Sequence, residues 1–182
     1  MTRWLGCAGR PPRERSTWTS ATALNAHIAN SSRRSAVVDA VRVTRLLRSL
    51  DEGLASLGRR QQTSTSERQE ETWLLAVKYL FVTTIEACID IAQHLCSTES
   101  LGTPRDNGDA MRKIGAAGIL TPATATALVK AVGFRNVLVQ EYVDVQDTIV
   151  MDRLANHADL LAFATEVGTW LTAQESPRSG LN

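Results

Sequence analysis

The sequence has 182 residues, enough for one domain with a sizeable hydrophobic core. Hydrophobic residues make up 43% of the chain and charged residues 21%, which are ordinary proportions for a soluble globular protein. Twenty basic and 19 acidic residues leave a formal net charge of +1, so the overall charge does not indicate a general nucleic-acid binder. No apolar stretch is long enough and sufficiently free of charge to predict a transmembrane helix. We therefore expect a cytoplasmic protein.

Residues 1–36 differ from the rest of the chain. They contain six arginines and a single acidic residue, Glu14, and they show no sustained apolar period. We interpret this segment as a disordered basic N-terminal extension. An overextended gene start is a second interpretation, because the helical pattern begins abruptly at Val37 and Val can reflect an alternative bacterial start codon.

Apolar residues recur in steps of three and four over residues 37–175, which predicts helices and no strands. The fourth helix has a clear start signal, because Thr121 can cap it and Pro122 suits its first position. The expected helices cover about residues 38–58, 67–97, 106–116, 122–140 and 145–173. We predict an all-α, up-down bundle of four to five helices over residues 37–175. Residues 176–182 are expected to form a flexible tail.

The three cysteines do not predict a cross-link or a metal site. Cys88 and Cys96 are eight residues apart on one predicted helix, so about 12 Å separates them along its axis, too far for a disulfide. Neither they nor Cys7 show metal-ligand spacing. We expect reduced cysteines that act as small apolar side chains, and no bound metal or other cofactor.

The most informative segment is Gly133–Tyr142, at the end of the fourth predicted helix. It places Arg135 and Asn136 before an apolar stretch that leads to Gln140 and Tyr142. An arginine suits the charge of a phosphate, and the neighbouring amide can hydrogen-bond a phosphate or the backbone. These residue types therefore favour a site that handles phosphate esters.

This segment resembles the signature of the HepT-type HEPN ribonucleases, the toxin halves of HepT/MntA toxin–antitoxin pairs. That signature reads Arg, four residues, His, one residue, Tyr, and here Gln140 stands at the His position. Residues 85–92 give a second, less specific match, and the likeness extends over about residues 37–173. The resemblance implies a homodimer that cleaves RNA without a metal in a composite cleft, and an MntA-like nucleotidyltransferase antitoxin as its partner.

The resemblance also assigns roles to single residues. Arg135 and Asn136 match the catalytic Arg and the polar residue beside it, and Tyr142 matches the Tyr to which the antitoxin attaches AMP. Asp90, in the second matched segment, is the acid expected to hold Arg135 in position. Two alternatives stay open, because Tyr142 can instead seal a helix interface and Asp90 can lie on a solvated helix face.

Gln140 leaves the chemistry open. A His that transfers protons contributes roughly 10²–10⁴-fold to a rate, whereas the amide of Gln does not titrate near neutral pH. The chain is therefore either a residual ribonuclease in which Gln140 orients the substrate, or a catalytically silent member. For the helical histidines, His94 and His157, we expect structural or surface roles. A non-catalytic helical interaction module that partners a minimal nucleotidyltransferase is the alternative from a different functional class.

Overall fold

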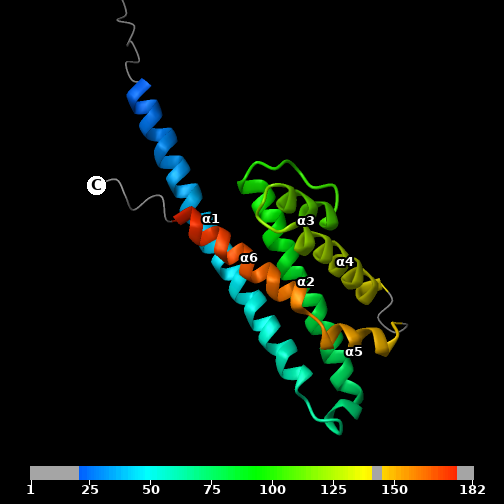
Figure 1. Ribbon diagram of the computed structural model, residues 1–182. Coiled ribbons are helices and arrows are strands. Elements are labelled where there is room, and N and C mark those ends of the chain that lie inside the picture. The colour runs from blue at the N-terminus through cyan, green and yellow to red at the C-terminus, as the bar shows by residue number, and fades with distance from the viewer. Residues whose placement is uncertain (1–20, 141–144, 176–182) are drawn as a thin grey trace, which may run out of the picture. The chain divides into compact units, whose positions relative to one another are not determined.

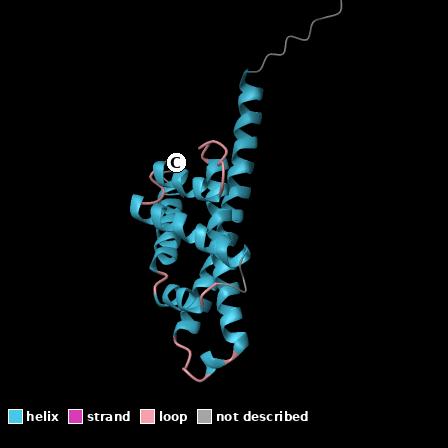
Figure 2. Ribbon diagram, turned by 90° about the vertical axis from the view of Figure 1, so that its right-hand side faces the viewer, coloured by secondary structure: helices cyan, strands magenta, loops and turns pink. Residues whose placement is uncertain are grey.

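The computed structural model describes residues 21–140 and 145–175, with side chains from Val41 onward except those of Gln69, Glu71 and Glu175. Within these ranges all regular structure is helical, which confirms the predicted all-α class (Figures 1 and 2). The elements are α1 (Ala21–Gln61), the 3₁₀ turn η1 (Glu67–Gln69), α2 (Glu71–Thr98), α3 (Asn107–Ala116), α4 (Pro122–Gln140), α5 (Asp147–Ala155) and α6 (Ala158–Glu175). None of the described helices has the length and hydropathy that a membrane-spanning segment requires.

Helix α1 starts earlier than the sequence indicated. Its backbone is helical from Ala21, so residues 21–36 are helical where we expected disorder. Five alanines and two arginines, which have high helix propensity, lie in this stretch and favour its helical conformation. Residues 1–20 and 176–182 lie outside the described residues. The chain divides into a compact unit of residues 1–37 and one of residues 38–182, and the description below concerns the second unit.

The boundaries of α4 agree with the prediction. The helix begins at Pro122, and the hydroxyl of Thr121 accepts a hydrogen bond from the backbone N–H of Thr124 at 3.3 Å. This pairing satisfies one of the N–H groups that lack a partner within the first turn.

The last predicted helix is wrong as a single element, because it consists of α5 and α6. The break falls at Asn156, which adopts φ −136° and ψ 90° and donates its backbone N–H to carbonyls at the end of α5. The buried ring of His157 lies 2.9 Å from the carbonyl oxygen of Leu154, and Arg153 pairs with Asp159 across the break at 2.5 Å. The bundle therefore has six helices in the described ranges, not four to five.

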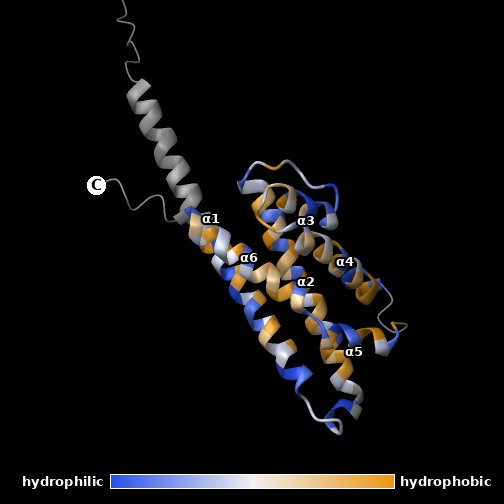
Figure 3. Ribbon diagram, in the orientation of Figure 1, coloured by the Kyte–Doolittle hydropathy of each residue, from blue (hydrophilic) through white to orange (hydrophobic). Residues whose placement is uncertain are grey.

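Helix α2 is the centre of the bundle. Helices α3, α4, α5 and α6 all pack against it, and Leu50, Leu54 and Leu57 of α1 belong to the same hydrophobic core. Figure 3 shows α2 as predominantly apolar along its length, whereas the described part of α1 alternates apolar and hydrophilic patches. A helix that is apolar around most of its circumference is one that neighbours cover on most sides.

Gly53 allows close packing between α1 and α2. A Cβ atom at this position would lie 2.4 Å from Oγ1 of the buried Thr84, whereas a Cβ at Gly58 would meet nothing within 4 Å. We expect Gly53→Ala to lower the free energy of unfolding by about 1–3 kcal/mol through overpacking. Gly58→Ala, the matched control, should raise it by about 0.5–1 kcal/mol through helix propensity. Urea unfolding measures both, and equal effects of the two changes would contradict this packing.

Candidate functional site

The residues of the Gly133–Tyr142 segment do not all lie on one side of α4. Arg135, Asn136 and Gln140 are on the helix, and Tyr142 lies outside the described residues. A helix turns about 100° per residue, so Gln140 is displaced by about 140° from Arg135 around the axis. Gln140 is exposed, whereas Arg135 is partly buried and reaches Glu86 of α2. Within one copy of the chain, the structure brings Arg135 and Asn136 together and leaves Gln140 apart from them.

The guanidinium group of Arg135 forms an ion pair with α2. Its Nη2 atom lies 2.8 Å from Oε2 of Glu86, without the geometry of a hydrogen bond, and 23% of the Arg135 side chain and 41% of the Glu86 side chain are exposed. Its Nη1 atom donates to Oδ1 of Asn136 at 3.3 Å. Partly exposed pairs of this kind contribute about 1 kcal/mol or less, so an incoming anion can displace Glu86 at low cost.

The acid beside Arg135 is Glu86 and not the predicted Asp90. Asp90 lies one helical turn further along α2, and its side chain is exposed. Positions 86 and 90 share one face of the helix, so the sequence pattern alone does not separate them. The position at which α4 meets α2 decides which carboxylate reaches Arg135. Glu86 lies in the segment 85–92 that the sequence analysis singled out, but no signal distinguished it there.

Aromatic contact next to Arg135 anchors α4 on α2. The rings of Phe134 and Phe81 meet edge to face, with centroids 5.5 Å apart. Phe81 is fully buried and Phe134 packs against the same core. Because Phe134 precedes Arg135 directly, this contact helps to set the position from which the guanidinium group projects.

The beginning of α4 is held by Glu166 of α6. The backbone N–H of Thr121 donates to one carboxylate oxygen at 2.7 Å, and the hydroxyls of Thr124 and Thr121 donate to the other at 2.7 and 3.1 Å. Burial raises the pKa of Glu166, but the hydrogen bonds from Thr124 and Thr121 outweigh it, so the pKa lies below its ordinary value. The ionised carboxylate also interacts favourably with the positive, N-terminal end of the α4 dipole.

The described cysteines and His157 have structural environments. Burial raises the pKa of the Cys88 thiol, and the negative charge of Asp159 adds to this effect, so the thiol stays neutral. Burial likewise raises the pKa of Cys96. Both thiols are free and buried, as expected for small apolar side chains, and Cys7 lies outside the described residues. His157 is buried at the start of α6, which confirms a structural role, and His94 is partly buried on α2.

Comparison with known proteins relates this arrangement to one family. Residues 45–167 match the sequence model of the family described as ribonuclease HepT-like. The mRNA nuclease HepT of Shewanella oneidensis is 32% identical over 74 residues, which cover 41% of this chain and 56% of that relative. The chain thus spans just over half the length of this curated relative.

Solved structures show the same fold. A tri-AMPylated HEPN toxin of Shewanella oneidensis, in complex with its MNT antitoxin, superposes with a TM-score of 0.65 at 23% identity, covering 70% of this chain and 96% of that one. The cytosolic protein YutE of Bacillus subtilis, of unknown function, gives a TM-score of 0.57 at 20% identity, covering 73% and 93%. At these identities the likeness establishes the fold.

The Glu166 contacts predict a pH-dependent contribution to stability. We expect Glu166→Gln to lower the free energy of unfolding at pH 7 by about 1–2 kcal/mol, because charge-assisted hydrogen bonds are lost. The pKa of Glu166 is lower in the folded protein than in the unfolded chain, where it is near 4.3. Its contribution to the free energy of unfolding is therefore complete above the unfolded pKa and is lost as the pH falls through the folded pKa. Urea unfolding at pH 7 and at pH 3 measures this. Glu99→Gln, at an exposed glutamate, is the control, and a difference that stays constant with pH would contradict the assignment.

Proposed function

The chain belongs to the HepT-like ribonuclease family, and on that premise we propose that it is the toxin component of a HepT/MntA-type toxin–antitoxin pair. Its substrate is RNA, and its inherited chemistry is metal-independent endonucleolytic cleavage. The observation that carries this proposal is the partly exposed Arg135, held by Glu86 and Asn136 where α2 meets α4. These residues all lie within the matched region.

The parts of the site suit the charge changes of RNA cleavage. The ribose 2′-oxygen loses a proton and attacks the adjacent phosphorus, and the 5′-oxygen leaves and gains a proton. Negative charge grows on the phosphate oxygens meanwhile, and a guanidinium group stabilises it through paired N–H donors. In this proposal Arg135 exchanges its weak ion pair with Glu86 for the phosphate, and the amide of Asn136 orients the guanidinium group.

Gln140 limits the proton transfers. Its amide can orient RNA or a water molecule but cannot accept or release protons near neutral pH. We propose that the chain with Gln140 lacks the general acid–base part of the mechanism and is catalytically silent or strongly weakened. A residual ribonuclease in which Gln140 positions the substrate is the rival version of the same function.

The active unit in this proposal is a homodimer. Arg135 and Gln140 point about 140° apart around α4, so one copy does not bring them to the same phosphate. A two-fold axis beside the end of α4 would place Gln140 of one copy near Arg135 of the other. Exposed apolar side chains next to Gln140, Val137 and Val139, support an interface at this end of the helix.

The proposed regulator is an MntA-like nucleotidyltransferase that modifies Tyr142. The phenol oxygen attacks the α-phosphate of ATP, a bond forms between tyrosine and AMP, and pyrophosphate leaves. Tyr142 follows Arg135 by seven positions in the sequence, and an attached AMP would add negative charge that repels RNA. A non-catalytic interaction module that only partners this enzyme is the second candidate, and Gln140 is the observation that favours it.

Restoring the family residue tests the catalytic proposal. We expect induced expression of the Gln140→His form to arrest growth, and the unaltered chain to arrest it weakly or not at all. Coexpression of an MntA-like nucleotidyltransferase should relieve the arrest. Gln140→Asn is the matched control, and adding Arg135→Ala to the His form should abolish toxicity. Arrest by the unaltered chain equal to that of the His form would refute the role given to Gln140. The absence of arrest from every form would favour the interaction module.

The modification has its own test, because the chain contains two tyrosines, Tyr79 and Tyr142. Incubation with the nucleotidyltransferase and ATP should raise the intact mass by whole AMP groups. Tyr142→Phe should remove the gain, and Tyr79→Phe, at a tyrosine that is 64% exposed, should keep it. Retention of AMP by the Tyr142→Phe form would place the modification elsewhere.

A further inference from the structure

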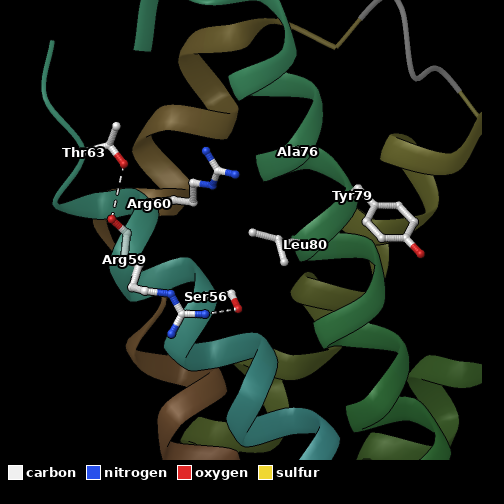
Figure 4. A pocket seen from close by; sticks show the side chains of 7 residues that line it. All are labelled: Ser56, Arg59, Arg60, Thr63, Ala76, Tyr79 and Leu80. Atoms are coloured by element: carbon white, nitrogen blue, oxygen red, sulfur yellow. Dashed lines mark hydrogen bonds between the residues drawn. The ribbon is translucent and has the colours of Figure 1, made fainter. Parts of the chain in front are cut away.

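The end of α1 and the beginning of α2 line a pocket of about 410 Å³ (Figure 4). Its lining consists of Ser56, Arg59, Arg60, Thr63, Ala76, Tyr79 and Leu80. Nη2 of Arg59 donates to the hydroxyl of Ser56 at 2.8 Å, and Figure 4 shows the side chain of Arg60 between the two helices. Two guanidinium groups thus line one cavity that none of the described acidic side chains enters, and the hydroxyls of Ser56 and Thr63 donate to the backbone carbonyls of Glu52 and Arg59.

The two arginines are not neutralised by neighbouring acids. Neither Arg59 nor Arg60 makes an ion pair with any residue that the structure describes, whereas Arg105, Arg112, Arg135 and Arg153 do. Cations at the end of a helix interact favourably with its dipole, which accounts for their place in the last turn of α1. The dipole does not account for the cavity, into which the guanidinium N–H groups can donate to an anion.

An exposed face of α2 connects this pocket with the Arg135 site. Tyr79, Thr83 and Glu86 follow one another at intervals of four and three residues, so they share one face of the helix. Tyr79 and Thr83 are exposed, and Glu86 pairs with Arg135. Figure 4 shows Leu80 directed toward the arginines, whereas the ring of Tyr79 extends away from them. The face therefore lies between the arginines of α1 on one side and Arg135 of α4 on the other.

We propose that Arg59 and Arg60 form a second phosphate-binding subsite for a single-stranded RNA whose scissile phosphate lies at Arg135. This inference rests on the proposed ribonuclease lineage. Tyr79 and Glu86 are about 10 Å apart along α2, and phosphates in a stacked strand follow one another every ~3.4 Å, so about three nucleotides span the interval. The exposed ring of Tyr79 offers an unpaired base a stacking surface on the way. Asp90, one helical turn beyond Glu86 on α2, has an exposed carboxylate that repels phosphates. An RNA strand is therefore expected to extend from Arg135 toward Arg59 and Arg60, and not toward Asp90.

Binding of a labelled dodecanucleotide and a dinucleotide to the full chain tests the subsite. Fluorescence anisotropy follows the first ligand and an NMR titration the second. Arg59→Ala/Arg60→Ala should weaken dodecanucleotide binding roughly three- to thirtyfold and leave the dinucleotide, which reaches Arg135 alone, unchanged. The slope of log K against log salt should fall by about 1.4, because two phosphate contacts of a single strand are lost.

The matched control is Arg42→Ala/Arg45→Ala, which removes two exposed arginines of the same helix about 21 Å or more from Arg59 along its axis. It should leave both affinities unchanged. Arg59→Lys/Arg60→Lys keeps the charge and should retain most of the salt slope, and urea unfolding confirms that each variant is folded.

The outcomes separate the subsite from the proposed function. The subsite would be overturned if Arg59→Ala/Arg60→Ala and Arg42→Ala/Arg45→Ala bind the dodecanucleotide with equal affinity. If Arg135→Ala abolishes that binding in the same experiment, the proposed function is kept. If the unaltered chain binds no RNA, both fail. Weaker binding of the antitoxin with unchanged RNA affinity would assign the pocket to the protein partner and overturn the RNA subsite.

Discussion

Burial of the apolar faces of α2 is the constraint on which the rest of the structure depends. Four later helices and the second half of the described α1 pack on it, and each fully buried large side chain contributes about 1.5–3 kcal/mol. This packing covers all of α2 except one stripe that contains Tyr79, Thr83 and Glu86. The candidate site lies along that stripe because it is the part of the central helix that remains accessible.

The proposed function depends on the weakness of the Arg135–Glu86 pair. A fully buried pair would resist separation, because removing one partner leaves an uncompensated charge in the interior. Here 23% of the Arg135 side chain and 41% of the Glu86 side chain are exposed, so in the proposed function a phosphate replaces the carboxylate at a smaller cost. Glu86 thus keeps the guanidinium group in place in the absence of RNA. The contacts of Glu166 at the beginning of α4 and of Phe134 next to Arg135 hold the helix in place on its neighbours.

Membership of the HepT-like family favours a ribonuclease, whereas Gln140 lacks the proton-transferring group that the proposed mechanism needs. The cationic part of the proposed mechanism is retained in Arg135, whereas the proton-transferring part is replaced by an amide. A protein with this combination keeps the groups that bind a phosphate and loses those that move protons. The proposed function therefore treats the binding and the cleavage of RNA as separable properties.

The sequence by itself determined the helical class, the boundaries of α4 and the segment from Arg135 to Tyr142, because these depend on local periodicity, on the Thr121–Pro122 start and on residue chemistry. Only the tertiary structure decided that Glu86, and not Asp90, reaches Arg135 and that Arg59 and Arg60 line a cavity with α2. It also separated α5 from α6 at Asn156. Periodicity tells which residues share a helix face. Which neighbour that face meets depends on where and at what angle the helices cross, and side-chain packing across the whole core sets that.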